Sequence, residues 1–112
     1  MPRRWTSEQI ERLLRDPDVR KRCGDDAVLV ATRGSLAAFP RAHLPSHLDV
    51  WVEVEGVPFT RRAMETARRG LAEAYTGHGI PFLYLGPSEV RLAVYDATTH
   101  RLGPWLWSYV DN

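Results

Sequence analysis

The chain has 112 residues, of which 44% are hydrophobic and 26% charged, so its composition is that of one globular domain and excludes a disordered chain. Fifteen Lys and Arg against 14 Asp and Glu give a net charge of +1, which indicates neither nucleic acid nor an anionic membrane as partner. A single cysteine, Cys23, excludes an internal disulfide and a multi-cysteine metal site, and the lack of an apolar run of about 18 residues predicts a cytoplasmic protein without a membrane segment.

Residues 6–24 predict a bent or split helix. Thr6 followed by Gln9 has the spacing of a capping box. Pro17 interrupts the helix, Asp18 is placed to cap a further turn, and Gly24 ends it. The apolar stripe of the first part consists of Ile10, Leu13 and Leu14.

Two strands are predicted next. Residues 27–32 form a short apolar run rich in β-branched side chains, which is typical of a buried strand. The connection at residues 33–46 shows no sustained period, and Ser35 could cap one short helical turn within it. Residues 47–57 alternate between apolar and polar side chains and predict the second strand.

The second half of the chain predicts a helix and three strands. Residues 60–77 repeat apolar side chains at helical spacing, and residues 80–85 are apolar on both faces, as in a central strand. Residues 90–95 and 105–110 form a final hairpin. The order α-β-β-α-β-β-β predicts one α+β domain over residues 1–112, with a mixed or antiparallel sheet and helices packed on one face.

One segment resembles the nucleotidyltransferase signature. Gly34 and Ser35 follow a strand, and residues 47–52 place Asp49 on the next one. The resemblance implies that the Gly-Ser turn holds nucleotide phosphates and that Asp49 is the second of two carboxylates that bind Mg²⁺. His47 stands at the first carboxylate position, and imidazole is a poor ligand for Mg²⁺.

A second segment resembles the restriction-endonuclease-like nucleases. Asp49, Glu53 and Glu55 lie on one face of the predicted strand at residues 47–57 and could gather a divalent metal beside Arg61 or Arg62, at the start of the next predicted helix. The lysine of the Glu-x-Lys hallmark is replaced by Glu55. Alternating acids on an amphipathic strand are also typical of its solvent-exposed face.

The last feature is aromatic. Trp105, Trp107 and Tyr109 are expected on one face of the final strand, and Trp51 lies on the outer face of the strand at residues 47–57. Such a set either packs beneath the helices or forms a surface for a partner.

The sequence therefore favours a small non-catalytic binding or regulatory module that acts through a sheet face or edge as a homodimer. A protein partner or self-association is expected, and no cofactor, metal or catalytic residue is predicted. The first alternative is a nucleotidyltransferase-like nucleotide-binding domain. A restriction-endonuclease-like nuclease is a second, less favoured alternative. The candidate binding residues are Gly34, Ser35, Asp49, Trp51, Trp105, Trp107 and Tyr109.

Overall fold

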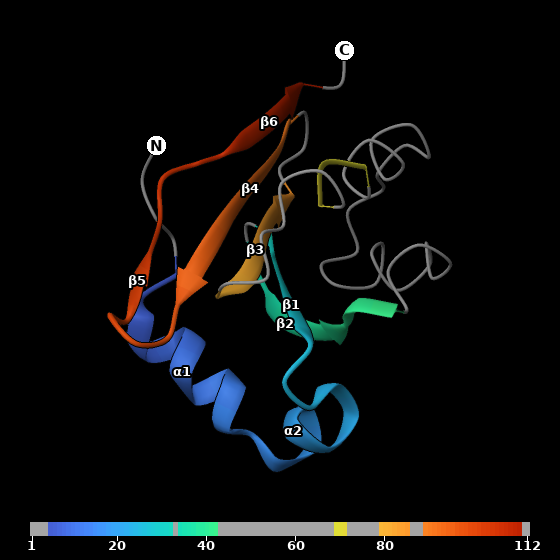
Figure 1. Cartoon of the computed structure of the whole chain (residues 1–112), viewed down its shortest axis with the longest axis vertical. Helices are drawn as coiled ribbons and strands as arrows, with labels where there is room; N and C mark the ends of the chain where they lie inside the picture. Colours follow the sequence, from blue (N-terminus) through green and yellow to red (C-terminus); the bar gives the residue numbers. More distant parts are fainter. Residues whose placement is uncertain (1–4, 33, 43–68, 72–78, 86–88, 111–112) are drawn as a thin grey trace.

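The computed structural model describes residues 5–32, 34–42, 69–71, 79–85 and 89–110, and of Glu89 and residues 107–110 it describes the backbone alone (Figure 1). Residues 69–71 are helical, and Leu71 is buried. Most of the predicted strand at residues 47–57 and helix at residues 60–77, with Asp49 and Trp51, lies outside the described residues. The elements are α1 (Ser7–Arg15), α2 (Pro17–Cys23), β1 (Ala27–Ala31), β2 (Leu36–Pro40), β3 (Ile80–Leu85), β4 (Glu89–Asp96), β5 (Arg101–Leu102) and β6 (Trp107–Val110).

The two N-terminal helices follow the sequence signals closely. Thr6 caps α1, and its capping box with Gln9 is formed in both directions. The helix pair is split at Pro17 as predicted, but the cap of α2 is Asp16 and not Asp18: the Asp16 carboxylate accepts from the Asp18 N–H at 2.9 Å. An Asp immediately before a proline at the first helical position satisfies the free N–H groups that follow.

The sheet is mixed, as the sequence predicts. Its strand order is β2-β1-β3-β4, after which both β5 and β6 pair with β4. Strands β1 and β3 run parallel, and each of the other pairs is antiparallel. The predicted central strand at residues 80–85 is confirmed as β3, which lies between β1 and β4.

The predicted helical turn after Ser35 is wrong, because Leu36–Pro40 is strand β2. All five of its residues pair antiparallel with β1, from Ala31 opposite Leu36 to Ala27 opposite Pro40. A helix of one turn is unfavourable by itself, whereas a second strand satisfies the backbone groups of the buried strand β1.

The predicted hairpin at the C-terminal end is confirmed for β4 and β6, and differs in one respect. Trp105 precedes β6 instead of belonging to it, and the short strand β5 also pairs with β4. Pro104 explains the interruption between β5 and β6, because proline has no N–H to donate to the β4 ladder.

Helices α1 and α2 pack on one face of the sheet (Figure 1). Ile10 of α1 and Val19 of α2 join Leu29, Phe82 and further buried residues in one apolar cluster. The opposite face is buried as well, through Val28, Val30, Leu83, Leu85, Val90 and Leu92. Among the described residues, no helix is long and apolar enough to cross a membrane.

Candidate functional site

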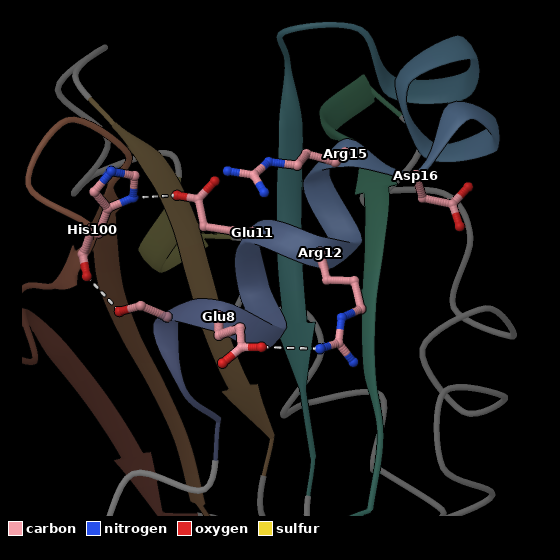
Figure 2. Close-up of a pocket in the computed structure, with 7 residues that line it drawn as sticks. Glu8, Glu11, Arg12, Arg15, Asp16 and His100 are labelled. Atoms are coloured by element: carbon pink, nitrogen blue, oxygen red, sulfur yellow. Dashed lines mark hydrogen bonds and ion pairs between the residues drawn. The ribbon is translucent and has the colours of Figure 1, made fainter.

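A groove of about 480 Å³ runs along helix α1 and reaches the turn between β4 and β5 (Figure 2). Helix α1 supplies most of its wall along its whole length, since side chains three or four residues apart lie on the same side of a helix. His100 closes the groove from the turn. The lining residues are Ser7, Glu8, Glu11, Arg12, Arg15, Asp16 and His100.

Glu11 is the centre of this groove. One of its carboxylate oxygens, Oε1, accepts the hydroxyl of Tyr95 and Nδ1 of His100, each at 2.8 Å. The Glu11 side chain is only 18% exposed, whereas that of His100 is 58% exposed. Ser7 adds a further contact, because its hydroxyl donates to the backbone carbonyl of His100.

These contacts shift two pKa values in opposite directions. Burial alone would raise the pKa of Glu11, but hydrogen bonds from Tyr95 and His100, with the charges of His100 and Arg15, lower it. Burial, followed by the hydrogen bond to Glu11 and its negative charge, raises the pKa of Tyr95 to about 12. Glu11 is therefore ionised at neutral pH, and Tyr95 is neutral.

The arrangement can orient an imidazole, but it lacks an activated nucleophile. Ionised Glu11 can only accept hydrogen bonds, so the proton in its hydrogen bond with His100 is carried by Nδ1 of His100. The Ser7 hydroxyl donates to the His100 carbonyl and not to its ring, so the three residues do not form a Ser-His-Glu triad. Within the described part of the chain, no group of three His, Cys, Asp or Glu side chains could hold a metal ion.

The predicted residues Gly34 and Ser35 line a second groove, of about 470 Å³, on the other side of α1. Its apolar wall includes Trp5, whose indole N–H donates to the carbonyl of Thr32 at 3.2 Å. Arg12 and Asp16 line both grooves, so α1 forms the ridge between them.

The Gly-Ser turn does not have the form that the nucleotidyltransferase resemblance implies. The N–H of Ser35 donates to the hydroxyl of buried Thr32 at 3.3 Å, and the N–H of Thr32 donates to the carbonyl of Ser35 at 2.9 Å. A phosphate held by the turn would compete with this bond from the Ser35 N–H. Strand β2 follows the turn where the signature has a helix.

Among the predicted aromatic residues, Trp105 is described with its side chain, and it lines neither groove. Trp105 packs edge to face on Phe82 and Tyr84, with ring centroids 6.4 Å apart in each pair. The backbones of Trp107 and Tyr109 lie in β6, opposite Leu92 and Val90. Trp105 therefore packs on the face of the sheet that α1 and α2 cover, as part of the partly buried border of its core.

The sequence alone did not single out Glu11 or His100, and it suggested Tyr95 only as a possible neighbour of the aromatic residues in the final strand. Glu11 and His100 are 89 positions apart, and Glu11 and Tyr95 are 84 apart, so no local motif joins them. The available signal was weak: Tyr95 is a polar aromatic residue at the end of a strand, where its hydroxyl needs a partner.

Comparison of the chain with protein-family models, with curated proteins and with solved structures gives no match. Its function is therefore inferred from the geometry of the described residues.

Proposed function

We propose that this chain is a cytoplasmic, non-catalytic binding domain whose partner is a second copy of itself, joined along the outer edge of strand β6. The observation that carries the proposal is the position of β6 at the border of the sheet (Figure 1). It pairs with β4 on one side, and no strand among the described residues pairs with its other side. Edge strands of this kind expose N–H and C=O groups that can pair with another chain.

The direction of the backbone groups in β4 follows from two hydrogen bonds. The carbonyl of Val94 accepts from the N–H of Gly103 at 2.8 Å, and the carbonyl of Leu92 accepts from the N–H of Leu106 at 2.7 Å. In an antiparallel ladder, alternate residues direct their backbone groups to the same neighbouring strand. Even-numbered residues of β4 therefore direct theirs toward β5 and β6.

The same alternation assigns the groups of β6. Val90 and Leu92 lie opposite Tyr109 and Trp107, so these two residues direct their backbone groups inward, to β4. The N–H and C=O of Ser108 then point to the outer edge. Ser108 is the position at which an added strand would form its first hydrogen bonds.

Charge supports a second copy as the occupant. Residues 103–110 contain no charged side chain, so two β6 strands can approach without repulsion. Strand β2, at the opposite edge of the sheet among the described residues, is less suited to pairing with another chain. Pro40 of β2 has no N–H, and the carbonyl of Ala38 accepts from the Arg22 side chain at 3.2 Å.

The mass in solution tests the proposal. Light scattering at micromolar concentrations should give the mass of two chains, and Ser108→Pro should give one, because proline removes the outward N–H and leaves the β4 ladder intact. Tyr109→Pro is the matched control: it removes an inward N–H and should lower the melting temperature. A wild-type mass of one chain, or a Ser108→Pro mass of two, would overturn the proposal.

A further inference from the structure

The turn at residues 97–100, between β4 and β5, is attached to helix α1 through one residue, His100. Its imidazole donates to Glu11 at 2.8 Å, and its carbonyl accepts from Ser7. Figure 2 shows the contact between His100 and Glu11 at the end of the groove. The backbone of His100 has φ of 56°, a left-handed conformation that is uncommon outside glycine. The contacts with α1 therefore hold a backbone conformation that is not intrinsically favoured.

The other hydrogen bonds described for this turn are internal. The carboxylate of Asp96 accepts from the N–H groups of Thr98 and Thr99, at 2.8 and 3.3 Å. These bonds shape the turn but do not attach it to α1. Loss of the bond between His100 and Glu11 would thus leave the hydrogen bond from Ser7 as the remaining polar contact of the turn with the helix, and would loosen the turn.

The bond between Glu11 and His100 depends on the charge of the carboxylate. Ionised Glu11 accepts hydrogen bonds from both His100 and Tyr95, and a bond to a charged acceptor is stronger than a neutral one. Protonation of Glu11 removes the charge and weakens both bonds. We propose that Glu11 and His100 form an acid-released latch, which holds the turn against α1 and opens when the carboxylate is protonated.

The sign of the pH dependence follows from the surroundings of Glu11. Its pKa is lowered in the folded protein, so its contribution is complete above the ordinary glutamate pKa and is lost as the pH falls through the lowered value. Hydrogen bonds from the Thr98 and Thr99 N–H groups also lower the pKa of Asp96, a second acid-sensitive group that must be controlled. The charged or titratable groups that face Glu11 or the turn are Glu8, Arg12, Arg15, Asp16, Tyr95, Asp96 and His100.

Two backbone amides provide a reporter and an internal control. The N–H of Gly103 bonds to Val94 immediately after β5, next to the latch, whereas the N–H of Leu106 bonds to Leu92 farther along the same edge. Hydrogen-exchange protection factors of both amides should be measured by NMR from about pH 6 to about pH 3, with correction for intrinsic exchange rates. Protection at Gly103 should fall about tenfold more than at Leu106 over this range.

Two variants separate the carboxylates. Glu11→Gln keeps an acceptor for His100 but cannot titrate, so the difference between Gly103 and Leu106 should no longer depend on pH. Asp96→Asn should show the same pH dependence of protection at Gly103 and Leu106 as the wild type. An equal fall at both amides, no fall at Gly103, or the wild-type profile in Glu11→Gln would overturn the latch.

A third variant keeps the test decisive if Glu11→Gln does not fold. Asn tolerates a left-handed φ, so His100→Asn preserves the turn while removing the imidazole. Protection at Gly103 should then be low at every pH, and wild-type protection near neutral pH would contradict the proposal. The latch does not depend on association through β6, because both amides bond within one chain.

Discussion

The hydroxyl of Tyr95 donates to the carboxylate of Glu11 across 2.8 Å, and this bond joins the end of β4 to the middle of α1. Tyr95 is fully buried, so its hydroxyl has little access to water as an alternative partner. The bond therefore fixes the helix on the sheet at a position that apolar packing alone would leave free to shift.

Removal of this hydroxyl should destabilise the fold. Tyr95→Phe leaves the ring in place and deprives Glu11 of one donor, so the free energy of unfolding should fall by about 1–3 kcal/mol. Urea denaturation followed by circular dichroism measures this loss. Tyr84→Phe is the control, since Tyr84 is buried in the same cluster and has no hydrogen bond to its hydroxyl within the described part of the chain. Equal losses in the two variants would contradict the importance of the Glu11 bond.

Alkaline titration should reveal a late deprotonation that belongs to Tyr95. Burial and the neighbouring Glu11 raise its pKa to about 12, above the ordinary value of about 10. A raised folded pKa stabilises the protein below about pH 10, and this stabilisation is lost as the pH rises toward 12. Absorbance at the phenolate band should show one late titration that is absent from Tyr95→Phe and shifted to lower pH in Glu11→Gln. A titration curve that Tyr95→Phe leaves unchanged at its alkaline end would contradict the prediction.

Much of the described fold could be predicted from local sequence signals. The Thr6 capping box, the break at Pro17 and the apolar strand β3 each depend on a few neighbouring residues, and all three are present. Strand β2 could not be predicted in this way. Its Leu-Ala-Ala-Phe sequence has no strong strand preference, and its conformation is set by pairing with β1.

The candidate site was harder to predict for a related reason. Glu11 has the ordinary appearance of a helix surface residue, and His100 that of a turn residue. Their contact exists because β4 delivers the turn to the side of α1, which is a consequence of tertiary packing. Composition and spacing carry no information about such a pairing.

The burial of both sheet faces predicts a sharp contrast between two substitutions to aspartate. Val30 is fully buried in β1, and a carboxylate there would have no partner, so Val30→Asp should cost more than about 4 kcal/mol and unfold the protein. Leu106 is 51% exposed, so Leu106→Asp should change the stability by less than about 1 kcal/mol. Melting curves by circular dichroism provide the comparison. A folded Val30→Asp protein would show that this face of the sheet can admit water.

Substitutions of Trp105 can show whether this aromatic residue packs in the core or binds a partner. Its ring lies edge to face with Phe82 and Tyr84, at interplanar angles of 65° and 63°, and the guanidinium of Arg91 lies 5.9 Å from its centroid. Trp105→Ala should therefore cost about 2–4 kcal/mol, because it opens a cavity over two core rings and removes the cation–π contact.

Trp105→Phe is the matched variant, since it retains one ring in the same place and should recover about half of that loss. Thermal unfolding and light scattering on the same samples separate the two roles. A packing role predicts a lower melting temperature in Trp105→Ala, with the mass of the folded protein unchanged. An unchanged melting temperature together with a loss of association would instead make Trp105 part of the binding surface, and the contact between copies would then have to extend from the edge of β6 to the face that α1 and α2 cover.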